Sequence, residues 1–295
     1  MIKGKTDKIF EGVCVALGVL LAILCLYPLL YTFGVSICSE AEWTDRNGLM
    51  LLFPTQPTFV AYKKIFGVGS YVVKALGVSL LRTVVGTITA VTINALVGYI
   101  LSRDNFPGKQ AYIYLLLFTI FFSGGLIPNY IVIKELNLLN NFWSMILPNI
   151  VNAWNILIFK QFFMGIPKEI EEAALIDGIG ELDLFVKIVL PLSTPVVASI
   201  GLFTMVGHWN NWFDVMIYID QAHSELWTLQ YYIMINFNNL SQIDSSKVEI
   251  GAGGGVSQLT QRMALTIVGF VPILCIYPFF QKFFKDGVYL GAVKG

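Results

Sequence analysis

The feature that most constrains the fold is a series of six long apolar segments. They lie at about residues 12–37, 72–101, 111–133, 142–164, 190–219 and 263–284. Each reaches the roughly 20 apolar residues that a helix needs to cross a bilayer. Backbone polar groups find no water in lipid, so a spanning segment has to be helical. The sequence therefore predicts an all-α, polytopic membrane protein with six transmembrane helices.

Composition agrees with this prediction. Of 295 residues, 56% are hydrophobic and only 13% are charged, whereas a soluble domain carries roughly 25% charged residues. The formal net charge is zero, which gives no sign of nucleic-acid binding. The four cysteines lie in or beside apolar segments without a CxxC pair, which favours apolar packing over a metal site. The first segment is too long for the core of a signal peptide, so it is expected to stay as a span.

Positive charges predict how the connections alternate across the membrane. Short loops rich in lysine and arginine are cytoplasmic by the positive-inside rule. Such residues cluster near both ends of the chain and after the second and fourth segments. This puts both termini, the loop 165–189 and the tail 285–295 in the cytoplasm. Two long loops, at about 38–71 and 220–262, then face outward, and residues 58–66 in the first are expected to form a short amphipathic helix.

The cytoplasmic stretch from Glu171 to Pro195 is polar in an otherwise apolar chain. Pro167 suits the first turn of a helix, and the acidic residues after it favour a helix N-terminus. Gly178 and Gly180 are expected to end this helix, before a second one that runs into the fifth span. A polar helix between two spans is well placed to contact another protein. A solvated helix without a partner is the alternative.

This stretch resembles the EAA motif of ABC-importer permeases. The residues that carry the resemblance are Glu172, Ala173, Ala174, Asp177, Gly178, Leu190 and Pro191. The chain end, from Asp286 to Gly295, is similar to the tail of the maltose-transporter-type permease of the carbohydrate-uptake group. Residues 121–141 and 271–284 look like the branch of that group for complex oligosaccharides. The resemblance covers essentially the whole chain and implies a type I ABC importer permease fold, with residues 1–295 as one transmembrane domain.

The resemblance also implies which residues couple this chain to an ATPase. Glu172 would form an ion pair or a helix-cap contact with a basic residue in a groove of the ATP-binding subunit. Ala173 and Ala174 would let the two backbones approach closely. Asp177 and Gly178 would set the turn that follows. The tail residues that would insert between two ATPase subunits are Gly291, Val293, Lys294 and Gly295.

The implied assembly contains several further chains. These are a second homologous permease, two ATP-binding subunits and an extracellular solute-binding protein. No Gly-x-x-x-x-Gly-Lys-Ser/Thr loop occurs here, and that loop is what cradles ATP phosphates. ATP and Mg are therefore expected on the partner subunits, and this chain is expected to bind no cofactor and no metal.

Polar residues within the spans are candidates for a substrate path. They are costly in lipid and usually face a cavity or another helix. The candidates are Asn149, Asn152, Asn155, Trp209, Asn210, Asn211 and Trp212. Amides pair with sugar hydroxyls and aromatic rings cover the apolar faces of pyranoses, although hydrogen bonding between spans is the alternative. Arg82 and Asp214 are expected in the outer part of the membrane, and His208 is expected to pack or to form a hydrogen bond.

The resemblance favours the permease subunit of an ATP-driven importer that takes up a carbohydrate, in particular an oligosaccharide. The alternative is a permease for a non-sugar solute such as an amino acid, a polyamine or phosphate. An enzyme is not expected, because the chain has only His208 and His223 and contains neither HExxH nor GxSxG. A channel or proton-coupled carrier would need more charges within the spans than Arg82.

Overall fold

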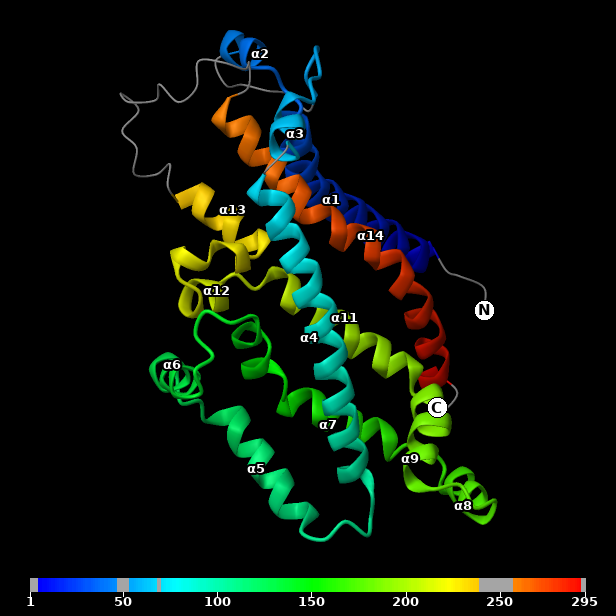
Figure 1. Cartoon of the computed structure of the whole chain (residues 1–295). Coiled ribbons are helices and arrows are strands. Elements are labelled where there is room, and N and C mark those ends of the chain that lie inside the picture. The colour runs from blue at the N-terminus through cyan, green and yellow to red at the C-terminus, as the bar shows by residue number, and fades with distance from the viewer. Residues whose placement is uncertain (1–4, 47–52, 68–69, 239–256, 293–295) are drawn as a thin grey trace. The chain divides into compact units, whose positions relative to one another are not determined.

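The computed structural model describes residues 5–46, 53–67, 70–238 and 257–292, with side chains between residues 8 and 281. Every regular element within these residues is a helix (Figure 1), which confirms the predicted fold class. The chain divides into two compact units. One comprises residues 1–73 and 235–271, and the other comprises residues 74–234 and 272–295. The single domain expected for residues 1–295 stays a prediction.

Six segments of the described chain are long and apolar enough to cross a membrane, if each bent helix pair counts as one. Three are continuous, at Lys8–Ser36, Tyr71–Ser102 and Gln258–Gln281, and match the first, second and sixth predicted spans. The third, fourth and fifth are helix pairs that bend by 116°, 51° and 82° at short breaks. The hydropathy pattern therefore agrees with the six segments but does not reveal that the fourth and fifth are broken; in the third, Gly124, Gly125 and Pro128 do indicate a break or kink.

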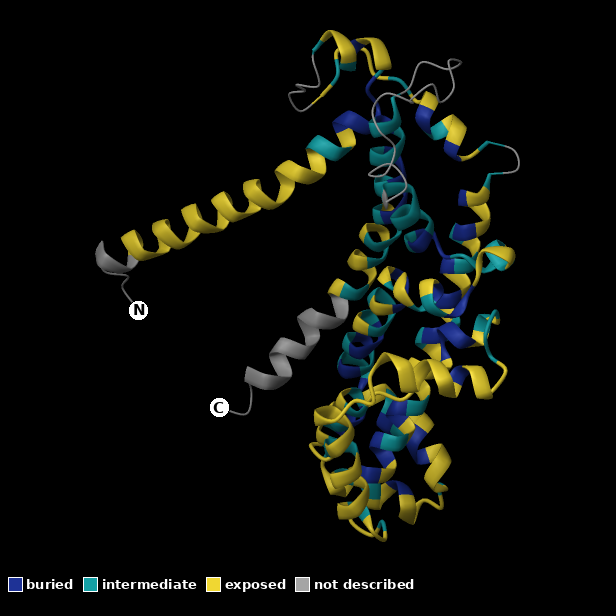
Figure 2. Ribbon diagram, turned by 90° about the vertical axis from the view of Figure 1, so that its left-hand side faces the viewer, coloured by how far each residue is buried: buried dark blue, intermediate teal, exposed yellow. Residues whose placement is uncertain are grey.

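The first unit contains α1 (Lys5–Ser36), α2 (Glu40–Asp45), α3 (Val60–Ile65) and the first part of α14 (Gln258–Ala292). Apolar side chains are exposed along most of α1 (Figure 2), as expected for a helix that faces lipid. The end of α1 packs in a small core, where Val35 and Cys38 are buried against Trp43 and Met263. The helix α3 confirms the one predicted within residues 58–66.

The second unit holds the three broken spans. It contains most of α4 (Tyr71–Ser102) and of α13 (Leu229–Asn238). Between them come α5 (Lys109–Phe121), α6 (Leu126–Glu135), η1 (Phe142–Met145), η2 (Leu147–Asn149), α7 (Ala153–Phe163), α8 (Lys168–Ile176), α9 (Glu181–Leu184), η3 (Phe185–Val189), α10 (Leu190–Leu192), α11 (Thr194–Asn210), α12 (Phe213–Tyr218) and η4 (Gln221–Leu226).

Local sequence accounts for the breaks. Gly125 precedes α6 with φ of +83°, a conformation that glycine adopts without steric cost. Asn152 precedes α7, and its Oδ1 accepts a hydrogen bond from the backbone N–H of Asn155 at 3.0 Å, as a helix N-cap does. Pro195 stands in the first turn of α11, where its missing N–H leaves no helical hydrogen bond unmade. Each break therefore falls where the residues favour a new helix start.

The helix α4 carries a stripe of small and polar residues. The stripe consists of Arg82, Gly86, Ala90, Asn94 and Gly98. Residues four apart are neighbours on a helix, and because a turn holds 3.6 residues the row winds gradually around α4, from contacts with α11 at Gly86 to contacts with α7 at Gly98. A Cβ at Gly86 would lie 2.6 Å from the ring of His208, and one at Gly98 would lie 2.7 Å from Cβ of Phe159. Only glycine permits such close helix contacts.

A hydrophobic core lies beneath the predicted coupling loop. It joins α4, α7, α8, α9, η3 and α11 through Ala95, Tyr99, Phe159, Phe163, Ala174, Leu184, Phe185, Val189, Val196 and Ile200. Three aromatic rings at its centre stand edge to face or tilted, with Tyr99 4.7 Å from Phe185 and 6.2 Å from Phe163 between centroids. Such pairs add to the free energy of burial. The loop therefore rests on packed side chains.

Candidate functional site

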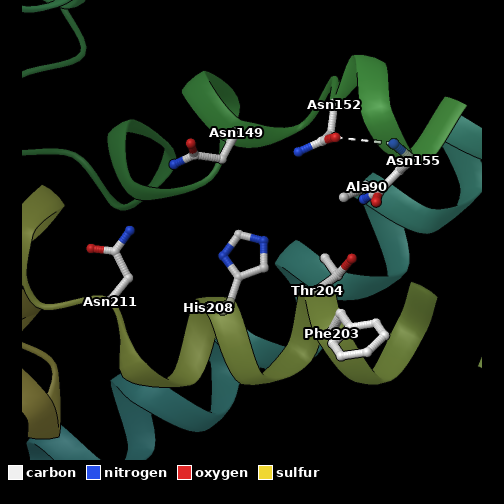
Figure 3. A pocket seen from close by; sticks show the side chains of 9 residues that line it. Ala90, Asn149, Asn152, Asn155, Phe203, Thr204, His208 and Asn211 are labelled. Atoms are coloured by element: carbon white, nitrogen blue, oxygen red, sulfur yellow. Dashed lines mark hydrogen bonds between the residues drawn. The ribbon is translucent and has the colours of Figure 1, made fainter. Parts of the chain in front are cut away.

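A polar cavity of about 290 Å³ opens between α11 and the break before α7. Its lining consists of Ala90, Asn149, Asn152, Asn155, Phe203, Thr204, Gly207, His208 and Asn211. Figure 3 shows Asn149 of η2, Asn152 at the break and Asn155 of α7 on one side, facing His208, Thr204 and Phe203 of α11. The described lining offers amides, a hydroxyl, an imidazole and one ring, and it includes no Asp, Glu, Lys or Arg.

The break before α7 is held open by Asn94, which α4 supplies. This side chain is fully buried. Its Nδ2 donates to the carbonyl oxygen of Ile150 at 3.1 Å, and its Oδ1 accepts from the N–H of Asn152 at 2.9 Å. These two bonds satisfy backbone groups that a broken helix leaves without partners. The asparagines on the cavity wall are thereby fixed to α4.

A second set of contacts centres on Arg82, whose side chain is 0% exposed. Its guanidinium donates to the carbonyl oxygens of Met145 at 3.1 Å and of Asn211 at 2.8 Å. It also forms an ion pair with Asp214. One arginine thus binds the end of η1 and the end of α11, the two segments that flank the cavity.

Asp214 in turn receives two side-chain amides. The Nδ2 atoms of Asn149 and Asn211 donate to its Oδ2 at 3.2 and 2.8 Å. A buried ion pair is tolerated only where further hydrogen bonds compensate for lost hydration. The sequence identified Arg82 and Asp214 as polar residues within or near spans, but not as partners. Positions 82 and 214 are far apart in the chain, so no local signal could pair them.

A second cavity, of about 430 Å³, shares Asn149 with the first. It lies among α6, η2 and α12, and its polar and aromatic lining includes Ser123, Asn129, Phe213 and Tyr218. The sequence did not single out Ser123, Asn129, Phe213 or Tyr218 as candidates. Their neighbours in the sequence are apolar, so a hydropathy pattern does not distinguish them. Ser123 and Asn129 reach this wall only because the third span bends.

The predicted path residues do not all come together. Asn149, Asn152, Asn155 and Asn211 line the polar cavity. Trp209 is only 2% exposed and faces a separate apolar cavity with Leu202 and Ile276. Asn210 and Trp212 line none of the cavities described here. His208, which was expected to pack or to form a hydrogen bond, packs against Gly86 and also borders the polar cavity.

The predicted coupling loop forms two short helices around a glycine turn. The first, α8, ends at Ile176 with Asp177 as its C-cap, and Gly178 follows with φ of +79°, a value that favours glycine. Glu172 and Ala173 are exposed. Ala174, expected to face a partner, is 5% exposed and packs in the chain's own core.

The other predicted ATPase contacts are placed as follows. Leu190 is partly buried against the core beneath the loop. Pro191 is exposed in the first turn of α10. In the tail, Gly291 belongs to the last turn of α14, while Val293, Lys294 and Gly295 lie outside the described residues.

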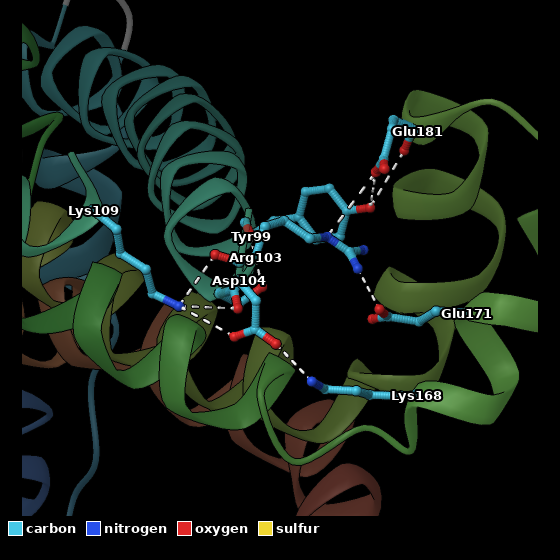
Figure 4. A network of polar contacts seen from close by, with 8 residues as sticks. Tyr99, Arg103, Asp104, Lys109, Lys168, Glu171 and Glu181 are labelled. Carbon is cyan, nitrogen blue, oxygen red and sulfur yellow. Dashed lines mark hydrogen bonds and ion pairs between the residues drawn. The ribbon is translucent and has the colours of Figure 1, made fainter. Parts of the chain in front are cut away.

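Charged side chains join α8 and α9 to the end of α4 (Figure 4). Arg103 forms an ion pair with Glu171 of α8 and stacks on the Tyr99 ring at 4.1 Å. The Tyr99 hydroxyl donates to Oε2 of Glu181 at 2.9 Å. Nearby, Nζ of Lys168 donates to Asp104 at 2.6 Å, and this hydrogen bond lowers the pKa of the Asp104 carboxyl.

Comparison with known proteins identifies the family. Residues 94–288 match the family described as "Binding-protein-dependent transport system inner membrane component". The chain belongs to this family. It is therefore a multi-pass membrane protein and a component of a transport system, not an enzyme, as the sequence predicted.

Individual relatives match this permease almost from end to end. It is 36% identical to the polygalacturonan/rhamnogalacturonan transport system permease protein YtcP of Bacillus subtilis (strain 168), over 98% of this chain and 99% of that one. It is 27% identical to the arabinooligosaccharides transport system permease protein AraQ of Halalkalibacterium halodurans, over 100% of both chains. A solved bacterial ABC transporter involved in the import of the acidic polysaccharide alginate contains a chain with TM-score 0.87 and 27% identity, over 96% of this chain and 99% of that one. These matches confirm the predicted permease fold.

Proposed function

We propose that this permease is the subunit of an ATP-driven importer through which an oligosaccharide crosses the membrane. The observation that carries the proposal is the convergence of four asparagines on one uncharged cavity, Asn149, Asn152, Asn155 and Asn211. Amides both donate and accept hydrogen bonds, as sugar hydroxyls do. Relatives named for polygalacturonan, rhamnogalacturonan and arabinooligosaccharide transport support the same substrate class.

The alternative of a non-sugar solute has less support. An amino acid, a polyamine or phosphate carries full charges at neutral pH. Desolvating a charge is costly unless an opposite charge or a hydrogen-bonded partner replaces its water. The described lining of the polar cavity contains no Asp, Glu, Lys or Arg that could supply an opposite charge, and Arg82 beside it is already paired with Asp214.

The loop around Glu172 is the proposed contact with an ATPase. Glu172 and Ala173 are exposed, and the loop that carries them rests on the hydrophobic core described above. The exposed apolar side chains of Ile176 and Leu182 flank the Gly178 turn. An acidic residue among exposed apolar ones suits docking into a groove with a basic residue. The chain tail, with Gly291, would add a second contact.

The remaining features of the assembly are part of this proposal. Two ATP-binding subunits would hold ATP and Mg, and a second, homologous permease would complete the path. An extracellular solute-binding protein, in line with the family description, would deliver the oligosaccharide. Both termini would lie in the cytoplasm, on the side of the ATPases.

The test is uptake by the reconstituted assembly in proteoliposomes, with a binding protein and a panel of oligosaccharides, amino acids and polyamines. Oligosaccharide uptake that depends on ATP is expected. Glu172→Lys should abolish uptake and release the ATPases, because it reverses the charge at the proposed contact. Glu169→Lys on the same helix, also exposed, is the matched control and should transport. Wild-type uptake by Glu172→Lys would contradict the docking assignment.

A further inference from the structure

Two carboxylates on opposite sides of the Gly178 turn are bound at the end of α4, by Tyr99 of its last turn and by Arg103, which directly follows it. Glu171 lies on α8 and pairs with Arg103. Glu181 begins α9 and accepts the hydroxyl of Tyr99, and its Oε2 also lies 4.0 Å from Nε of Arg103. Figure 4 shows the carboxylates of Glu171 and Glu181 directed at this one place on α4. We define Tyr99, Arg103, Glu171 and Glu181 as the clasp.

The clasp differs from an ordinary surface ion pair. The Arg103 and Glu171 side chains are only 22% and 19% exposed, and the guanidinium lies over the Tyr99 ring. Tyr99 itself is 5% exposed and belongs to the core beneath the loop. Partial burial and stacking strengthen such contacts relative to solvated pairs. Glu172, one residue further along, is exposed and takes no part in the clasp.

One helix, α4, connects the clasp to the residues that hold the cavity walls. About 26 Å of α4 separate Tyr99 from Arg82, at about 1.5 Å per residue. Between them Asn94 binds the break before α7, and Arg82 binds the ends of η1 and α11. A displacement of the loop that reaches α4 therefore acts directly on the groups that hold the cavity walls.

We propose that Tyr99 and Arg103 are positioning residues that hold both arms of the coupling loop on α4. Through them, movement of the loop is transmitted to α4 and so to the cavity. This inference rests on the proposed docking of the loop to an ATPase. Docking itself would depend on Glu172 and transmission on the clasp, so the two can be tested separately.

The experiment measures substrate transported per ATP hydrolysed by the reconstituted assembly. Arg103→Met keeps the apolar stem on Tyr99 but removes the charge, and Glu171→Gln is nearly isosteric. Each is expected to lower the ratio on the order of tenfold, within the range of coupling energies between sites. ATPase docking and hydrolysis should persist, unlike in Glu172→Lys. The double variant should be no worse than the more affected single variant, because both changes remove one interaction.

The matched control is Lys187→Met. Lys187 pairs with Asp183 four residues away at 2.9 Å, and both are largely exposed, so this pair does not reach α4. Its ratio should equal that of the wild type. A purely structural role of the clasp would reduce the amount of assembled complex but not the transport per ATP.

Several results would overturn the proposal. One is a wild-type ratio of transport to ATP hydrolysis in Arg103→Met. Another is a double variant whose ratio falls by the product of the two single losses. A third is a fall of the ratio in Lys187→Met as large as in Arg103→Met. If Arg103→Met yields no assembled complex, Tyr99→Phe decides, since it removes only the hydroxyl that binds Glu181. A lowered ratio in Tyr99→Phe supports the clasp, and an unchanged ratio refutes it.

Discussion

The contact between Gly98 of α4 and the helix α7 makes a quantitative prediction. A Cβ at this position would lie 2.7 Å from Cβ of Phe159, 3.0 Å from the carbonyl oxygen of Ile156 and 3.1 Å from N of Lys160. The first distance is 0.7 Å short of the 3.4 Å at which ordinary contact begins. Two of the three atoms belong to the backbone of α7, so no rotamer change relieves the clash. Gly98→Ala must push the two helices apart.

The magnitude follows from a comparison within the same helix. Overpacking of this kind costs about 1–3 kcal/mol, while replacing a helical glycine by alanine gains up to about 1 kcal/mol. Gly77, also on α4, has no atom within 4 Å of its ideal Cβ. Gly77→Ala therefore gains the free energy of alanine's higher helix propensity and causes no clash. The two variants should differ by about 1–3 kcal/mol, whatever the propensity is worth in this membrane helix.

The assay is thermal unfolding of the purified permease complex in lipid nanodiscs, followed by tryptophan fluorescence. At about 2–4 °C per kcal/mol for a chain of this size, Gly98→Ala should melt roughly 2–12 °C below Gly77→Ala. Transport should fall with Gly98→Ala, because α7 carries part of the cavity wall. Equal melting temperatures for the two variants would refute the close packing of α4 on α7.

Three further predictions follow from polar contacts. Asp214→Ala leaves the Arg82 charge buried and unpaired and should cost about 3–5 kcal/mol; a melting temperature near that of the wild type would contradict the pairing. Asn94→Ala frees two backbone groups and should cost about 1–3 kcal/mol and lower oligosaccharide uptake, measured in proteoliposomes; full uptake would argue against its role. A hydrogen bond with Asp220 raises the pKa of His223 above its ordinary 6.5. This pair should therefore stabilise residues 220–226 fully below pH 6.5 and lose that effect as the pH rises through the raised pKa, a change that hydrogen exchange should detect in the wild type but not in His223→Asn.

Hydropathy predicted the spans well because it depends only on local composition. The segments at 72–101 and 263–284 are continuous helices whose ends agree with the prediction within a few residues, apart from the longer end of α14. The helix start after Pro167 and the turn at Gly178 were also predictable, because capping and positive φ are local properties. The motif in this loop indicates the family to which the chain belongs, because residue types and spacing within one loop are also local properties.

The cavity could be predicted only in part. Asn149, Asn152 and Asn155 recur every three residues within the fourth predicted span, yet Asn149 and Asn152 lie on either side of its break. Trp209, adjacent to His208, faces apolar side chains, because successive residues of a helix point about 100° apart. The pairing of Arg82 with Asp214 depends on how three spans bend, and bends arise from packing between segments far apart in sequence.

The stripe on α4 also bears on how such permeases diverge and can be engineered. Arg82, Gly86, Asn94 and Gly98 each meet a different feature of α7 or α11: a carbonyl oxygen, an imidazole ring, a helix start and a Cβ. If α4 alone were replaced by that of a relative, its residues would meet partners on α7 and α11 that belong to a different sequence. Substitutions at these four positions should therefore persist only in compensating sets. The segment that recombination can exchange without loss of folding is α4 together with α7 and α11, and chimaeras that aim to alter substrate choice should be cut outside all three.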